Sequence, residues 1–327
     1  MNQEICLIWL NEIESISLTQ KKALLYLHDT PMAIFEYLKD KISDDSLLDK
    51  AKEIYEINQK HNIKTLALFD LMKHKPIIGQ LPWPILVYYK GSLNYKKSVA
   101  LVGTRKMSTH GYYFTEQLCD KVAQGDAIIN TGLSDGIEKK TLVFCLEKDY
   151  HANVFVAHGL NTCSPKSKSS LMELAASKGT ILSPFSVLSK QHRLSFLERN
   201  ALLAMWSDEL VLVEADATSK SANVIDYGIK FNKKTSTILG PTDSKRCELN
   251  NQLIREKSLG ELSMSLNQDI ETMINHPVSK ILREKAMSRD DLSLIFSNIN
   301  IDSTLAKLEF MRIASCKANG KWYYNGW

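Results

Sequence analysis

The sequence predicts an α/β fold, with a Rossmann-like, doubly wound parallel sheet between an N-terminal helical domain and a C-terminal winged helix. Three observations support this: a strand, loop, helix, strand unit at 98–138, continued alternation of apolar runs and helical patterns after it, and an Asn-Gly hairpin signal near the end of the chain. We expect a helical domain at 1–60, a sheet domain at 61–245, a linker at 246–269 and a winged helix at 270–327.

The unit at 98–138 organises the rest of the chain. An apolar run at 98–102 ends at Gly103, the polar loop GTRKMSTHG leads into a helical pattern, and a second apolar run at 127–129 ends in the glycine loop TGLSDGIE. Glycine lets the chain turn at the strand end, and the next helix points its free N–H groups into the crevice above the sheet. Arg105 would add a guanidinium suited to phosphate. Neither GxGxxG nor GxxxxGK[ST] is present.

The alternation continues up to residue 239. Apolar runs are expected at 153–157, 180–182, 209–214 and 235–239, and helices at 139–149, 168–177, 197–206 and 221–232. Ligands of such sheets bind beyond the carboxyl ends of the strands, where the loops here are basic. Their cations are Arg105, Lys106, Lys166, Lys168, Lys190, Arg193, Arg199 and Lys220. Cations spread over several loops suit an extended polyanion better than a single phosphate.

The composition is that of an ordinary globular protein. The chain has 327 residues, 44% of them hydrophobic and 24% charged, with a formal net charge of +4, so a nucleic-acid surface would have to be local. The six cysteines form no CxxC pair, which favours reduced thiols in the cytoplasm over disulfides or a zinc site. No stretch reads as a signal peptide or a membrane span.

No catalytic set emerges from the sequence. The histidines at 110, 151, 158 and 192 do not have metal-ligand spacing, and Ser108 and Ser134 lie in glycine-containing loops without a GxSxG elbow. We therefore expect neither enzymatic activity nor a metal or cofactor.

The two ends of the chain predict smaller domains. Residues 1–60 read as short helices with small connections, which favours packing or protein contact. Near the C-terminus, three helical stretches precede two β runs joined by Asn319-Gly320, the order of a winged helix. Its third helix, STLAKLEFMR, has few cations, so protein contact, autoregulation and duplex binding all stay open.

Several motifs, in the same order along the chain, resemble those of the DNA-processing protein A family, DprA or Smf. GTRKMSTHG and TGLSDGIE resemble the paired loops GSRxxSxYG and SGLARGID. KGSL at 90–93, FLERN at 196–200 (family FPxRNR) and LVLVEADATSKS at 210–221 (family LVVEAxxxSGS) also match. Because ordered agreement at separate places is more specific than any one motif, the chain is identified as a divergent member of this family.

The resemblance implies a role in DNA uptake and recombination. Proteins of this family bind and protect single-stranded DNA in the sheet crevice, form homodimers through the Rossmann-like domain and load the RecA recombinase during natural transformation. The N-terminal region would be a SAM-like domain. Carried over to this sequence, together with neighbouring cations, the expected DNA-binding residues are Gly103, Thr104, Arg105, Lys106, Gly132, Gly136, Arg193, Phe196, Arg199, Asn200 and Lys220. Arg105 and Arg199 would be the main phosphate contacts, with backbone N–H groups near Gly132 and Gly136 as additional donors.

The sequence departs from the family pattern at several positions. Asp135 stands where the second loop usually has arginine, Leu197 and Ala201 replace a proline and an arginine, and Lys220 replaces the glycine of SGS. These changes weaken the case for DNA binding more than the case for the fold. Two alternatives therefore stay open: a sensor that binds one small nucleotide in the same crevice, and a recombinase adaptor that has lost DNA binding.

Overall fold

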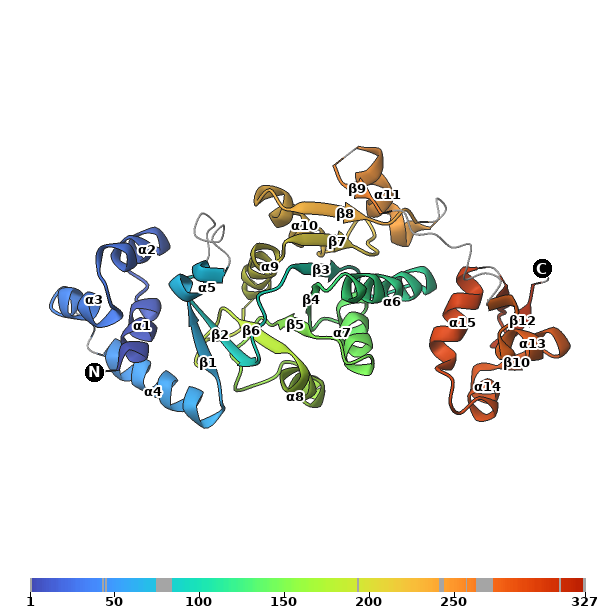
Figure 1. Ribbon diagram of the computed structural model, residues 1–327, viewed down its shortest axis with the longest axis horizontal. Helices are drawn as coiled ribbons and strands as arrows, with labels where there is room; N and C mark the ends of the chain where they lie inside the picture. Colours follow the sequence, from blue (N-terminus) through green and yellow to red (C-terminus); the bar gives the residue numbers. More distant parts are fainter. Residues whose placement is uncertain are drawn as a thin grey trace.

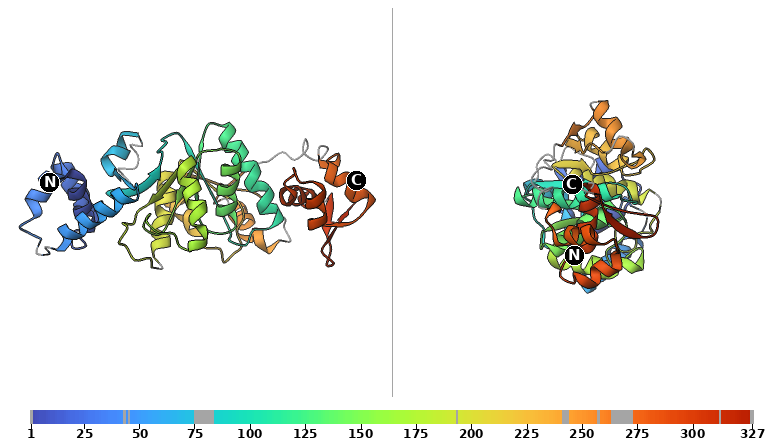
Figure 2. Two further views of the ribbon diagram at one scale, coloured as in Figure 1. Left: turned by 90° about the horizontal axis from the view of Figure 1, so that it is seen from below. Right: turned by 90° about the vertical axis from the view of Figure 1, so that its right-hand side faces the viewer.

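The computed structural model places three units along the longest axis of the molecule (Figure 1; Figure 2). It describes residues 2–42, 44, 46–74, 84–192, 194–240, 244–256, 258–262, 273–311 and 313–325. A helical unit lies at one end, a large sheet in the middle and a small mixed unit at the other end. Within the described residues, no helix is long and apolar enough to cross a membrane.

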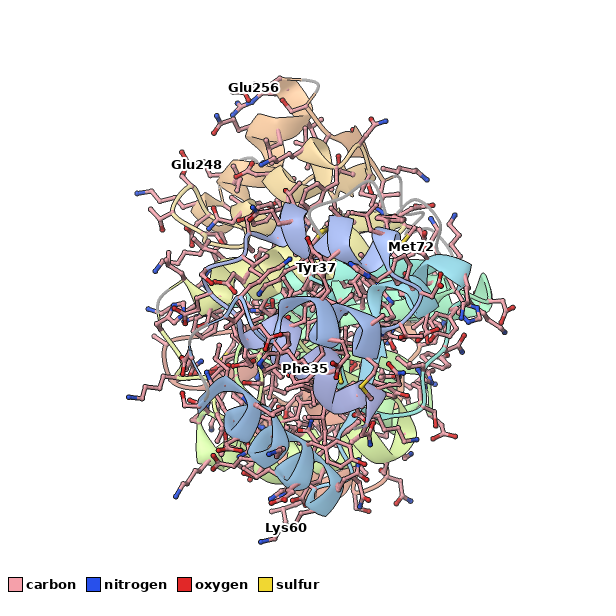
Figure 3. The ribbon with its side chains drawn as sticks, turned by 90° about the vertical axis from the view of Figure 1, so that its left-hand side faces the viewer. Phe35, Tyr37, Lys60, Met72, Glu248 and Glu256 are labelled. Atoms are coloured by element: carbon pink, nitrogen blue, oxygen red, sulfur yellow. The ribbon has the colours of Figure 1, made fainter. Side chains whose placement is uncertain are left out.

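The N-terminal unit consists of four helices. They are α1 (Gln3–Glu12), α2 (Leu18–Leu27), α3 (Pro31–Leu38) and α4 (Ser46–Lys60). Side-chain caps at Asn2, Ser17 and Thr30 accept from the first N–H groups of α1, α2 and α3, which explains why these helices start there. Figure 3 views this unit end-on, with Phe35 and Tyr37 on α3 and Lys60 at the end of α4.

The central unit is a nine-stranded sheet of order β1-β2-β6-β5-β4-β3-β7-β8-β9. Its strands are β1 (Lys64–Ala67), β2 (Leu86–Gly91), β3 (Ser98–Val102), β4 (Ile128–Gly132), β5 (Ala152–Phe155), β6 (Thr180–Ser183), β7 (Glu209–Leu212), β8 (Lys234–Thr237) and β9 (Gly260–Glu261). The strands from β6 to β9 in this order run parallel to one another, whereas β1 and β2 are antiparallel additions at one edge. This confirms the α/β class and the mostly parallel sheet expected from the alternation.

Helices cover both faces of the sheet. The side chains of β3 alternate between two cores, with Leu101 in one and Val102 in the other. Helices α6 (Thr109–Gln124), α7 (Ile137–Glu147) and α8 (Ser169–Lys178) pack on the first face. Helices α5 (Leu68–His74), α9 (Ser195–Trp206) and α10 (Ala222–Lys230) pack on the second. Buried strands flanked in this way explain why the sheet segments read as continuous apolar runs.

The described part of the expected linker, 246–256 and 258–262, belongs to the central unit. It contains α11 (Glu248–Arg255) and β9, which extends the sheet by pairing with β8. The buried Asn250 amide donates to backbone carbonyls of Leu212 and Val213, and its oxygen accepts from the Ala215 N–H. The polar side chain of Asn250 satisfies buried backbone groups of the sheet. The polar composition that suggested a linker therefore includes residues that hold this segment against the sheet.

The C-terminal unit has α13 (Pro277–Glu284), α14 (Arg289–Ile295), α15 (Ile301–Phe310) and a three-stranded sheet of order β10-β12-β11. The strands are β10 (Met287–Ser288), β11 (Ala314–Cys316) and β12 (Lys321–Tyr324), and β11 and β12 form the expected hairpin. The assignment to the winged-helix fold stays a prediction.

Helix α15 packs on α6 of the central unit. Buried Glu116 of α6 accepts a 2.6 Å hydrogen bond from the Ser303 hydroxyl and forms a 2.7 Å ion pair with Lys140 of α7. Thr109, the first residue of α6, donates to the carboxylate of Glu309 near the end of α15. The C-terminal unit is thus docked through polar contacts around a buried carboxylate.

Candidate nucleic-acid interface

A groove lies at the point where the strand order of the sheet reverses. From β3 the chain proceeds to β4 on one side, while β7 lies on the other, and the loops that follow these strands diverge to form a crevice. The crevice has a volume of about 1170 Å³ and is lined by the loops after β3, β4 and β7 and by the first turn of α9. It opens at the carboxyl ends of the strands, where the sequence placed the ligand.

Most of the expected DNA-binding residues meet in this groove. Those that line it are Gly103, Thr104, Arg105, Lys106, Phe196, Arg199, Asn200 and Lys220. Gly132 and Gly136 are not among the lining residues but contact residues that are, and Arg193 lies outside the described residues. Segments separated by more than a hundred positions in the sequence therefore contribute to one surface.

The exposed part of the groove is cationic and contains an aromatic ring. Arg105, Lys106 and Lys220 are all exposed to solvent. Phe196 is 38% exposed, and its ring centre lies 5.9 Å from the Arg105 guanidinium carbon. An exposed ring beside cations is an arrangement that can stack on a base while the cations bind phosphates.

Arg199 has a different environment from the other cations. It is only 4% exposed, and its Nη1 donates to Glu138 Oε1 at 3.0 Å within a buried ion pair. Burial alone would raise the pKa of Glu138, but the Arg199 charge and the Ser134 N–H more than compensate and lower it below its ordinary value. The guanidinium thus already has a buried carboxylate partner, which argues against the expected role as a main phosphate contact.

The glycines of the second loop allow close packing. A Cβ at Gly132 would lie 2.0 Å from Arg199 Nη1, and one at Gly136 would lie 2.1 Å from the Thr104 carbonyl oxygen. Gly136 also has φ +76°, which favours glycine.

Two N–H groups of this loop donate to protein acceptors. The Ser134 N–H donates to Glu138 Oε2 at 2.9 Å and the Ile137 N–H to the Thr104 carbonyl at 3.1 Å. These two N–H groups are therefore not free anion donors, and the expectation of other backbone donors near Gly132 and Gly136 stays a prediction.

Asp135 introduces a negative charge next to the groove. Its side chain is 64% exposed and lines an adjoining pocket together with Arg105. Lys168 Nζ lies 3.0 Å from Asp135 Oδ1 and donates to the Leu133 carbonyl at 2.7 Å. The hydrogen bond from Lys168 is the main cause of the lowered pKa of Asp135, so this carboxyl is ionised at neutral pH. The ammonium group of Lys168 therefore already bonds to two protein groups, Asp135 and the Leu133 carbonyl.

A buried polar cluster beside the groove was not expected from the sequence. Glu214, just beyond β7, accepts from the N–H of Ser108 at 2.8 Å and from its hydroxyl. His110 and Cys247 complete a cluster whose potential ligand atoms all lie within 4.8 Å of one another. Burial lowers the pKa of His110 to about 4 and raises that of Cys247 to about 12. The three residues come from segments far apart in the chain, so sequence motifs based on short ligand spacings cannot detect this cluster.

Comparison with known proteins gives the family. The profile described as DNA recombination-mediator protein A matches residues 78–273, more than half of the chain. Protein Smf of Synechocystis is 28% identical over 207 residues, which is 57% of this chain and 52% of that protein. DNA processing protein DprA of Streptococcus pneumoniae is 28% identical over 162 residues, which is 48% of this chain and 56% of that protein. The chain spans about half the length of these curated relatives.

Solved structures show the same fold. The DprA crystal structure from Streptococcus pneumoniae superposes with a TM-score of 0.60 at 21% identity, covering 83% of this chain and 93% of that one. DNA processing protein A from Helicobacter pylori, studied for its unique single-stranded DNA binding mode, gives a TM-score of 0.55 at 22% identity, covering 65% and 95%. With the family profile, the ordered motifs and this fold in agreement, the chain belongs to the DNA recombination-mediator protein A family, DprA or Smf.

Proposed function

We propose that this protein binds single-stranded DNA in the groove above β3 and β7 and acts in DNA processing and recombination, without being an enzyme. The observation that carries the proposal is the convergence of Arg105, Lys106 and Lys220 around the exposed ring of Phe196. Membership of the family and the single-stranded DNA binding of the Helicobacter pylori relative support it. By the same analogy we propose that the protein is a cytoplasmic homodimer that protects single strands and loads RecA onto them.

The groove chemistry suits a strand. Each exposed cation can neutralise one phosphate and release a counterion, and Phe196 offers a stacking surface that accepts any base. The Arg199–Glu138 pair would hold the loop after β4 and the start of α9 in place behind these groups. We therefore assign the direct contacts to Arg105, Lys106, Lys220 and Phe196, and a supporting role to Arg199.

The test is binding of fluorescent oligonucleotides of increasing length, at several salt concentrations, to the wild type and to Arg105→Ala/Lys106→Ala/Lys220→Ala. Three exposed cations outside the groove provide the matched control, Lys60→Ala/Lys230→Ala/Arg255→Ala. We expect affinity that grows with length and falls with salt, and a log–log salt slope that decreases by roughly 0.7 per lost contact only in the groove variant.

The alternatives give different results. A nucleotide sensor would saturate with a mononucleotide and gain nothing from length, whereas an adaptor without DNA binding would bind neither ligand at low salt. Equal loss in the groove and control variants would mean that general charge, rather than this groove, governs binding. RecA loading is tested by RecA filament formation on DNA coated with single-strand-binding protein, with and without this chain.

A further inference from the structure

The buried cluster of His110, Glu214 and Cys247 has the composition of a metal site. It combines an imidazole, a carboxylate and a thiol, the ligand types that zinc uses in proteins. The three residues come from the start of α6, the loop just after β7 and the 3₁₀ turn Lys245–Cys247. All three are buried, so they do not resemble the exposed acidic groups that often cluster without a ligand.

The distances fit one small ion. Cys247 Sγ lies 3.9 Å from His110 Nδ1 and 3.8 Å from Glu214 Oε1. Ligands of a tetrahedral zinc ion lie roughly 3.5 Å apart, given metal–ligand bonds of about 2.0–2.3 Å. The two separations from Cys247 would therefore need to shorten by only a few tenths of an ångström around a metal ion, and the third, between His110 and Glu214, is at most 4.8 Å.

Surrounding groups orient the three side chains. Ser108 donates to Glu214 through both its N–H and its hydroxyl, and the His110 ring bonds to the backbone of Leu239. Outer hydrogen bonds of this kind fix ligand orientation in metal sites.

Two glycines leave room for the cluster. A Cβ at Gly240 would lie 2.4 Å from Cys247 Sγ, and one at Gly111 would lie 2.4 Å from Glu214 Oε2. The backbone therefore approaches both candidate ligands closely from two sides.

We propose that His110, Glu214 and Cys247 form a zinc-binding site that joins α6, β7 and the turn before α11. Binding forms Zn–N, Zn–O and Zn–S bonds, leaves the fourth tetrahedral position to a water molecule, and displaces the Cys247 thiol proton to solvent. The thiolate and the carboxylate then balance the two positive charges of the ion, so the buried site is neutral. Arg246 next to Cys247 donates to the Lys106 carbonyl, so the metal would also fix the loop that carries Lys106. The proposal is independent of DNA binding.

The test uses the full-length protein, freed of metal by chelation and titrated with Co²⁺. We expect one equivalent per chain, with a thiolate-to-cobalt charge-transfer band that Zn²⁺ abolishes, release of a proton, and a higher melting temperature with either metal. Cys247→Ala should lose the band, and His110→Gln should weaken binding at least tenfold. Cys6→Ala and Cys316→Ala, which alter a buried and an exposed thiol elsewhere, should match the wild type.

Three results would overturn the assignment. The first is the absence of a charge-transfer band in the wild type. The second is a band that persists in folded Cys247→Ala or disappears in either control cysteine variant. The third is undiminished metal binding in His110→Gln. If Cys247→Ala does not fold, the wild-type spectrum and metal binding by His110→Gln still test the site. Undiminished metal binding by His110→Gln would contradict it.

Discussion

Arg199 and Glu138 face each other across the wall of the groove as a buried ion pair, with 3.0 Å between Nη1 and Oε1. Their side chains are only 5% and 7% exposed. The pair joins the first turns of α9 and α7, and Gly132 provides the space in which it fits. An arginine that looks like a DNA contact in the sequence is thus paired with a buried carboxylate in the wall of the groove.

Arg199→Ala should destabilise the central unit, because it leaves the Glu138 carboxylate buried without its partner. A buried charge left in this way typically costs about 3–5 kcal/mol. Thermal unfolding followed by circular dichroism should show a lowered melting temperature. The double variant Arg199→Met/Glu138→Leu, which removes both charges, should recover much of the loss. A single variant as stable as the wild type would contradict this role.

The same pair makes stability depend on acidity. The pKa of Glu138 is lowered in the folded protein from its ordinary value of 4.5, so the folded state favours the ionised carboxyl. The stabilisation is complete above pH 4.5 and is lost as the pH falls through the folded pKa. Unfolding free energies measured across this range should fall more steeply for the wild type than for Glu138→Gln. Parallel curves would show that the pair does not contribute to the pH dependence.

Asp135→Asn should strengthen binding of single-stranded DNA. The exposed carboxylate lies in the pocket next to Arg105 and repels phosphates that approach this side of the groove. Its removal should raise affinity roughly two- to five-fold at low salt, the scale of a surface charge interaction of up to about 1 kcal/mol. Fluorescence anisotropy measures the change, and Asp226→Asn, an exposed carboxylate on α10 that does not line the groove, is the control. A gain in both variants would point to net charge alone.

Phe196→Leu should weaken binding without lowering stability, because the ring is partly exposed and the replacement stays apolar. Loss of one stacked base costs about 1–3 kcal/mol, or roughly five- to a hundred-fold in affinity. The salt slope should be unchanged, since no phosphate contact is removed. Titrations at two salt concentrations separate this effect from the loss of a cation. Wild-type affinity would mean that Phe196 only packs the start of α9.

Ser303→Ala should loosen the C-terminal unit from α6. It removes a 2.6 Å hydrogen bond to the buried carboxylate of Glu116 while leaving the Lys140 pair in place. A hydrogen bond to a charged group contributes about 1.5–3 kcal/mol. Hydrogen exchange in α15 and in the facing part of α6 should therefore accelerate. Ser293→Ala, which alters a half-buried serine on α14, is the control and should leave both helices unchanged.

The sequence identified the sheet and the position of the groove for physical reasons. Strands buried on both faces read as apolar runs, and a parallel sheet requires its binding loops at one edge. Gly103 and Arg105 could therefore be placed correctly from a short motif. The described linker residues were misjudged because Asn250 and its neighbours are polar, although Asn250 is fully buried.

The missing parts of the site depend on long-range contacts. The packing of α7 against α9 determines whether Arg199 faces solvent or Glu138. Neither TGLSDGIE nor FLERN contains that information on its own. The same holds for Cys247 beside His110, which are 137 positions apart. Ser108 and Glu214 both lie in family motifs, GTRKMSTHG and LVLVEADATSKS. The match of both motifs was the signal in the sequence that could have placed these two loops next to each other.

The docking of α15 on α6 also limits how this chain can assemble. The polar surface around Glu116 is already covered by Ser303 and Lys307 of the same chain. A second copy can use this surface only by displacing α15, so a dimer that keeps the C-terminal unit in place must form through another part of the sheet domain. Oligomerisation through α6 would therefore require release of the C-terminal unit.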